Sequence, residues 1–100
     1  MALGRLADSE AIPGLIASLD DKDLAVRETT IAAIGKIKDR QAVCPLIRCL
    51  TDKEITIRIG AAEVLGKLGD RRAIEPVKKL ENDPFWDVRK AAEKAGRKLR

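Results

Sequence analysis

The sequence predicts an all-α protein built as an α-solenoid, that is, a stack of helix pairs. Residues 8–38, 39–69 and 70–100 align position for position, which indicates three repeats of 31 residues. Within each repeat, apolar residues recur at helical spacing in two segments that a short polar turn separates. No segment shows the apolar–polar alternation that is typical of a strand. We therefore expect one domain, residues 1–100, made only of helices.

The central repeat shows the helix–turn–helix pattern most clearly. Its polar turn covers residues 51–54. The apolar positions on either side of the turn are Val43, Leu46, Ile47 and Leu50 in the first helix, and Ile57, Ala61, Val64, Leu65 and Leu68 in the second. Residues 1–7 match the end of such a repeat, so we expect them to form a partial N-terminal repeat.

Proline marks the predicted helix starts. Pro13, Pro45 and Pro76 lie near the start of each first helix, where no amide donor is required. These helices are therefore expected to start late or to bend early. Asp83 directly before Pro84 predicts an N-cap followed by the first turn of the last helix.

Composition limits the class of protein. Hydrophobic residues make up 45% and charged residues 36% of the 100 residues. The chain is therefore too apolar to be disordered and too charged to be a membrane span. Aromatic residues make up only 2%, so the predicted core is aliphatic. There is no signal-peptide pattern and no apolar run of about 18 residues, so we expect a cytoplasmic protein without a membrane partner. The many charged residues, with one Asn and one Gln, are also typical of heat-tolerant proteins.

Cys44 and Cys49 are the only cysteines. Five residues of helix place them about 140° apart around the helix axis, so we do not expect them to bridge each other. The chain has no histidine, so the two cysteines cannot complete a four-ligand zinc site without carboxylates or a second chain. We expect both to be small buried thiols, and we predict no metal or cofactor site. Free thiols are typical of a reducing compartment.

Several positions of the central repeat carry the same or a similar residue in at least one adjacent repeat: Ala42, Leu46, Leu50, Asp52, Ile57, Arg58, Leu65 and Gly66. The pattern resembles short HEAT-like repeats of the phycobilisome-lyase type, over residues 2–99. The resemblance implies a right-handed superhelix. Members of that superfamily include bilin-lyase subunits, scaffolds and iron-dependent deoxyhypusine hydroxylases. The hydroxylase motif needs His–Glu pairs, and this chain has no histidine.

Aspartate and arginine each recur at one position of every repeat. The aspartates are Asp21, Asp52 and Asp83, and the arginines, six residues further on, are Arg27, Arg58 and Arg89. We expect bidentate, partly buried links between each turn and the helix that follows, within a unit or across units. A binding role for the arginines is the alternative. Nothing distinguishes one aspartate from its equivalents, so we predict no catalytic carboxylate pair.

The second helices carry the predicted binding face. In HEAT-like proteins they line the concave surface, so the resemblance implies that a partner binds there. The expected contact residues lie opposite the apolar stripe or beside that side: Thr29, Ala32, Lys36, Ile59, Gly60, Glu63, Lys67, Lys90, Ala91, Lys94 and Lys98. Small residues such as Gly60 would let a partner approach closely, or would ease the packing of adjacent helices instead.

A basic residue recurs in the last turn of each second helix, as Lys36, Lys67 and Lys98, with Arg5 at the same position of the partial repeat. A cation there interacts favourably with the helix C-terminus, by roughly 0.3 to 1 kcal/mol. The alternative is that the row contacts an acidic protein or a phosphate backbone.

Phe85 and Trp86 are the only aromatic residues. Trp86 aligns with Leu24 and Ile55 and is expected in the core. Phe85 aligns with acidic residues, so we expect it to be exposed, either as an interface anchor or as a cover for the open end of the stack.

The third repeat differs from the other two. Lys78, Glu81 and Gly96 replace apolar residues, which predicts a polar cap at this end of the stack. Residues 8–38 contain six acidic and four basic residues, whereas residues 70–100 contain six acidic and ten basic residues. Such a charge gradient would orient a charged partner.

The sequence thus predicts a non-catalytic protein-binding scaffold, because it contains no nucleophile–base pair, metal ligand set or glycine-rich phosphate loop. The alternative is binding of nucleic acid or an acidic partner through Lys36, Lys67, Lys98 and the basic third repeat, without the stacking aromatic residues of single-strand binders. A subunit of a lyase-type enzyme is less favoured. Self-association through the short N-terminal piece is a further expectation.

Overall fold

The computed structural model describes residues 11–100, and these are helices and short turns without a strand, as predicted. Residues 11–18 are helical and precede α2 (Leu24–Ile37). The elements that follow are η1 (Arg40–Ala42), α3 (Val43–Cys49), α4 (Ile55–Leu68), η2 (Arg71–Ala73), α5 (Ile74–Leu80) and α6 (Trp86–Leu99). The expected partial repeat, residues 1–7, lies outside the described residues.

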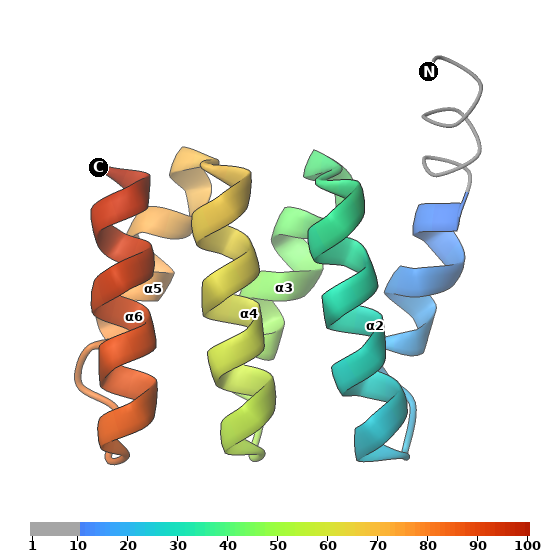
Figure 1. The fold of residues 1–100 in the computed structure, drawn as a ribbon, viewed down its shortest axis with the longest axis horizontal. Helices are drawn as coiled ribbons and strands as arrows, with labels where there is room; N and C mark the ends of the chain where they lie inside the picture. Colours follow the sequence, from blue (N-terminus) through green and yellow to red (C-terminus); the bar gives the residue numbers. More distant parts are fainter. Residues whose placement is uncertain (1–10) are drawn as a thin grey trace.

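The helices form two layers. α2, α4 and α6 have 14 residues each and lie side by side in one layer, with α3 and α5 behind them (Figure 1). α4 packs against both α2 and α6, while α3 packs against α4 and α5 against α6. The right-handed superhelix stays a prediction.

The core between the layers is aliphatic, as the composition predicts. Leu46, Ile57, Leu65, Val77 and Val88 are completely buried, and each such side chain stabilises the fold by about 1.5 to 3 kcal/mol relative to exposure. Within residues 11–100, no helix is long and apolar enough to cross a membrane.

Glycines bring the second helices close together. A Cβ atom at Gly35 of α2 would lie 3.0 Å from Cγ2 of Val64 in α4. A Cβ atom at Gly66, the equivalent position of α4, would lie 3.1 Å from the Cα atom of Ala95 in α6. Because these two positions lack side chains, the three helices can form one closely packed layer.

The first helices of the second and third pairs start late, as the prolines predict. Pro45 and Pro76 are the third residues of α3 and α5, and a 3₁₀ turn precedes each helix. Asp39 and Asp70 cap these turns, since their side chains accept hydrogen bonds from the amides two residues on.

The prediction that Asp83 is the N-cap of the last helix is wrong. α6 begins at Trp86, with Phe85 at the N-cap. The Oδ1 atom of Asp83 instead accepts a hydrogen bond of 2.9 Å from the amide of Phe85. Asp21 and Asp52 bond the amides two residues on in the same way. This aspartate therefore closes the turn before the helix in every unit.

The expectation that Trp86 is buried is also wrong, because the residue is 61% exposed. The equivalent Leu24 and Ile55 are partly buried against the core. Nζ of Lys90 lies 5.6 Å from the centre of the Trp86 ring. At the other end of the stack, Val26 is 37% exposed, where the equivalent residues of α4 and α6 are completely buried.

The two cysteines are free, as expected, but only Cys49 is buried. Burial raises the pKa of the Cys49 thiol to about 11. Cys44 is exposed, which corrects the prediction for this residue. It aligns with the exposed Glu75 on the outward side of the first helix, and Nη1 of Arg72 donates a hydrogen bond of 3.6 Å to its sulfur.

Candidate functional site

The exposed face of α2, α4 and α6, here called the second-helix face, is hollowed by two grooves. The first groove lies between α2 and α4 and has a volume of 560 Å³. The second lies between α4 and α6 and has a volume of 170 Å³. Glu63 and Lys67 of α4 line both grooves, so the two hollows adjoin. Most of the predicted contact residues meet in these grooves: Ala32, Lys36, Gly60, Glu63, Lys67, Ala91, Lys94 and Lys98.

Thr29 and Ile59 lie outside these grooves. Thr29 lines a separate hollow of 320 Å³ together with Val26, and its hydroxyl donates a hydrogen bond of 2.8 Å to the carbonyl of Ala25. Ile59 is partly buried and packs against the core. Neither side chain therefore belongs to the surface that the grooves form.

Lys90 and Phe85 also lie away from the grooves. Nζ of Lys90 is 3.5 Å from a carboxylate oxygen of Glu93 and lies over the ring of Trp86. Phe85 is 49% exposed, as expected. It faces the preceding unit, in a hollow that Ile47 also lines, so it does not cover the open end of the stack.

Gly60 lies where α2 packs against α4. It lines the first groove, but a Cβ atom at this position would lie 3.2 Å from Cγ2 of Ile31 in α2. Of the two roles expected for Gly60, this short distance supports the second, because its small size eases the packing of α2 on α4. Ala32, which is exposed in the same groove, offers the free space instead.

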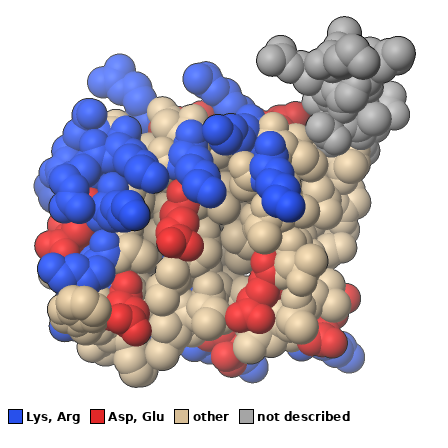
Figure 2. Space-filling model, in the orientation of Figure 1, with Lys and Arg blue, Asp and Glu red and all other residues tan. Residues whose placement is uncertain are grey.

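Charges of both signs line the first groove. Lys36, Lys67 and Lys98 lie in the last turns of α2, α4 and α6. Figure 2 shows Lys and Arg side chains over the C-terminal halves of these helices, most densely over α6. Glu28, which sequence reasoning missed, lines the first groove together with Glu63. The position of Glu28, four residues before Ala32, could have revealed it, since residues four apart share a helix face.

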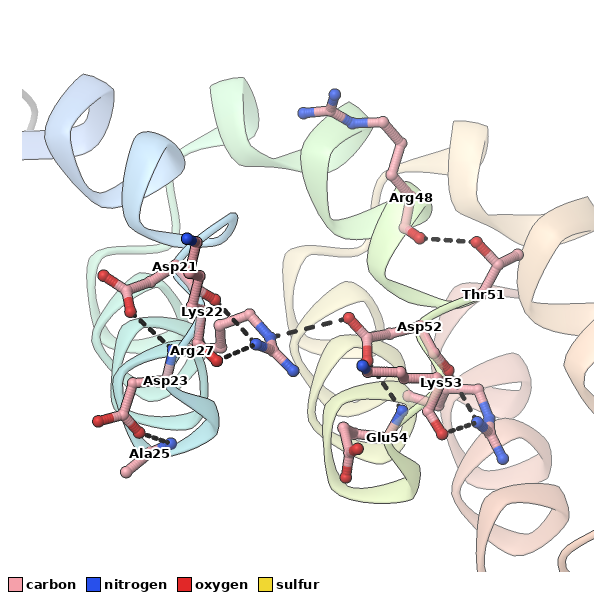
Figure 3. Close-up of polar contacts among 11 residues, drawn as sticks. Asp21, Lys22, Asp23, Ala25, Arg27, Arg48, Thr51, Asp52, Lys53 and Glu54 are labelled. Carbon is pink, nitrogen blue, oxygen red and sulfur yellow. Dashed lines mark hydrogen bonds and ion pairs between the residues drawn. The ribbon is translucent and has the colours of Figure 1, made fainter.

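Within each unit, the arginine bonds the backbone of the turn rather than the aspartate side chain. Nη1 of Arg27 donates a hydrogen bond of 2.8 Å to the carbonyl of Asp21 (Figure 3). Arg58 and Arg89 make the same bond to the carbonyls of Asp52 and Asp83. The sequence thus predicted the link between turn and helix correctly, but not its acceptor atom.

The carboxylates form links across units. Nε of Arg27 lies 3.8 Å from Oδ2 of Asp52, as Figure 3 shows. Nε of Arg58 lies 2.9 Å from Oδ2 of Asp83, and their side chains are only 11% and 7% exposed. Nη2 of Arg58 also donates to Oδ1 of Asp83 at 3.3 Å. These contacts form an inter-unit ladder and give Arg27 and Arg58 a structural role.

A second kind of ion pair lies at the start of η2. Arg72 donates from Nε and Nη2 to the two carboxylate oxygens of Asp70, at 3.0 and 2.9 Å. The side-chain hydrogen bonds from Arg72, followed by its backbone amide, lower the pKa of Asp70 to about 2. The equivalent of Arg72 in the central repeat is Gln41, so this pair belongs to the third repeat and has no counterpart there.

Stacked helix pairs, a shared grooved face and a ladder between units define a helical-repeat protein that presents an extended surface. The chain belongs to the HEAT repeat family, because the family model for HEAT repeats matches residues 1–54 and 12–96. The resemblance to HEAT-like repeats is thereby confirmed. No curated protein matches the sequence.

The fold is also similar to a solved structure, that of the complex of CpcE and CpcF of phycocyanin lyase from Nostoc sp. PCC7120. The TM-score is 0.64 at 23% sequence identity, and the match covers 95% of this chain and 55% of that chain. The present chain therefore spans about half the length of that lyase chain. This likeness shows that the two chains share a fold.

Proposed function

We propose that this protein is a non-catalytic scaffold that binds another protein on the second-helix face. The observation that carries the proposal is the continuity of the two grooves, which Glu63 and Lys67 join across α2, α4 and α6. A continuous hollow surface on closely packed helices suits an extended segment or a helix of a partner protein. The complex of two chains in the similar solved structure is compatible with this role.

The charges in the first groove favour a protein over a nucleic acid as the partner. Glu28 and Glu63 lie there beside Lys36 and Lys67. A phosphate backbone would meet two carboxylates in this groove, whereas a protein partner can place an opposite charge against each side chain. Partner selection on this face then depends on the pattern of charges rather than on net positive charge.

The second groove supports the alternative partner, a nucleic acid or an acidic protein. Lys67, Lys94 and Lys98 line it with one acidic residue, Glu63. Figure 2 shows the densest group of basic side chains on the same side, over α6. The helix C-termini below these lysines carry partial negative charge, which weakens their attraction for an anion. A subunit of a lyase-type enzyme is the least favoured proposal.

The test is capture of a partner from an extract of the native cells, with and without nuclease treatment, followed by calorimetry with the purified partner. Ala32→Arg and Glu63→Arg change exposed positions in the grooves, so each is expected to weaken binding and to raise the dissociation constant at least about tenfold. Thr56→Arg, at an exposed position of α4 outside the grooves, is the matched control and is expected to leave binding unchanged.

The lysine row separates the two kinds of partner. If nucleic acid binds, replacing Lys36, Lys67 and Lys98 by Ala is expected to flatten the slope of log K against log salt by roughly 3 units. A partner that tolerates Ala32→Arg and Glu63→Arg but is lost with the triple variant would contradict the scaffold proposal and support the electrostatic alternative.

A further inference from the structure

A larger hollow lies away from the second-helix face, where the second and third units meet on the side of α3 and α5. Its volume is 750 Å³, within the range of about 300 to 1,000 Å³ of ligand pockets. The apolar part of its lining consists of Ile47, Leu50, Pro76, Leu80, Pro84 and Phe85. We call this hollow the edge groove. It is open to partners that do not touch the second-helix face.

Phe85 distinguishes the edge groove from the equivalent place one unit earlier. The residue at that place is Glu54, an acid. The guanidinium carbon of Arg58 lies 5.8 Å from the centre of the Phe85 ring, and the amide of Phe85 is bonded to Asp83. The backbone and one ring face are therefore held, while the side chain is 49% exposed. A fixed, half-exposed aromatic ring beside aliphatic side chains is the arrangement that interface anchors use.

Around the edge groove, the acidic side chains face an arginine, whereas two basic side chains have no ion-pair partner in the described residues. The carboxylate of Asp83 is bound to Arg58, and that of Asp52 faces Arg27. Lys53 and Lys79 also line the groove and are exposed. Neither lysine has an ion-pair partner in the described part of the chain. The rim therefore offers two unmatched positive charges beside an apolar floor.

We propose that the edge groove docks a peptide segment of a partner protein, with one aliphatic anchor residue flanked by acidic residues. The anchor packs against Ile47, Pro76 and the Phe85 ring, which removes apolar surface from water. The acidic residues pair with Lys53 and Lys79, which fixes the register of the segment and steers its approach. This site is separate from the second-helix face and adds a second docking surface to the protein.

The test is selection of a phage-displayed random-peptide library on the wild-type protein, with counter-selection on Phe85→Glu. That variant carries the residue type that Glu54 provides one unit earlier, so the fold is expected to persist, and Phe85→Ala serves as a second variant. Enriched peptides are expected to combine an aliphatic residue with acidic neighbours. Their dissociation constants are expected to rise at least about tenfold in both Phe85 variants.

Two further measurements locate the binding. Replacing Lys53 and Lys79 by Ala is expected to weaken binding and to reduce its salt dependence. Trp86→Ala removes the neighbouring exposed aromatic residue, which does not line the groove, and is expected to leave binding unchanged. In ¹⁵N NMR spectra, peptide-induced shifts are expected in residues 47–58 and 76–85, with α2 unaffected.

Several outcomes would overturn the proposal. One is the absence of any enrichment on the wild-type protein over Phe85→Glu. Others are enriched peptides without acidic residues, or an equal loss of binding with Trp86→Ala. Peptide-induced shifts confined to Lys36, Lys67 and Lys98 would show that the peptides bind the second-helix face instead.

Discussion

The guanidinium of Arg58 and the carboxylate of Asp83, 25 residues apart, join the central helix pair to the next at 2.9 Å. The Nε atom is not aligned for a hydrogen bond, so this contact is an ion pair, and the hydrogen bond to the carboxylate comes from Nη2. Nη1 bonds the carbonyl of Asp52. One side chain thus holds its own turn and the turn of the following unit.

The first prediction concerns this pair. Arg58→Met leaves the Asp83 carboxylate, 7% exposed, without its counter-charge, so the free energy of unfolding is expected to fall by about 3 kcal/mol. Arg27→Met is the matched control and is expected to cost less, because Asp52 is 23% exposed and 3.8 Å away. Urea unfolding followed by circular dichroism measures both values. Equal losses in the two variants would contradict a special role for Arg58.

Alignment of the repeats predicted the helix pairs, the aliphatic core and the late start at Pro45 and Pro76, because these properties depend on local sequence. It failed for Trp86, since alignment does not show which neighbouring side chains cover a position, and Trp86 is 61% exposed. It left two roles open for Gly60, because the distance to Ile31 is set by the packing of two helices.

The candidate site was predictable only in part, for the same reason. Helical periodicity placed Glu63, Lys67 and their equivalents on the open face, and the structure brings them together in two grooves. The edge groove combines two first helices with two turns. Periodicity along one helix therefore indicates Phe85 as exposed, but it does not reveal the hollow that Phe85 completes.

The second prediction uses three helical glycines. Gly66→Ala is expected to destabilise the protein by about 1 to 3 kcal/mol, since the new Cβ atom would lie 3.1 Å from the backbone of Ala95. Gly35→Ala is expected to cost less, because the atoms it approaches belong to the Val64 side chain. Thermal and urea unfolding of these variants gives the values.

Gly96 provides the opposite case. The atoms nearest to a Cβ at this position are side-chain atoms of Arg100 and Glu81, at 3.7 Å, which is an ordinary contact distance. Gly96→Ala is therefore expected to stabilise α6 by up to about 1 kcal/mol through helix propensity. A stabilising Gly66→Ala together with a destabilising Gly96→Ala would contradict the packing that the structure shows.

The third prediction concerns acid stability. The pKa of Asp70 is lowered from 3.8 to about 2 by Arg72. A depressed carboxyl pKa contributes stability above the unfolded value, and this contribution is lost as the pH falls from about 4 to about 2. Arg72→Gln, which introduces the residue type found at Gln41, is expected to be less stable than the wild type near neutral pH, with the difference shrinking in this acidic range.

NMR titration provides a direct readout of the same effect. The Asp70 carboxyl is expected to titrate at a higher pH in Arg72→Gln than in the wild type, because the guanidinium donors are gone while the backbone amide at position 72 still donates. An unchanged pKa of Asp70, or a stability difference that persists undiminished at about pH 2, would show that Arg72 does not control this group.

The fourth prediction concerns the thiols. With a pKa of about 11, only about one part in a thousand of Cys49 is thiolate at a pH of about 8, and the thiolate is the reactive form. Iodoacetamide is therefore expected to modify the exposed Cys44 in the folded protein and Cys49 only after unfolding, as peptide mass spectrometry can show. Cys44→Ser is the control, and rapid modification of Cys49 in that variant would be incompatible with its burial.

Arg89 holds the carbonyls of Asp83 and Pro84 in the same way as Arg58 holds its own turn. No aspartate of a following unit reaches Arg89 in residues 11–100. A second copy of residues 39–69, inserted between Gly69 and Asp70, would bring an aspartate to face Arg58 and an arginine to face Asp83. The arginine–aspartate link between units would therefore be reproduced at the new junction. Duplication of a gene segment that encodes one unit can therefore lengthen this protein while keeping the ion pairs between units, and the binding surface would grow with each added unit.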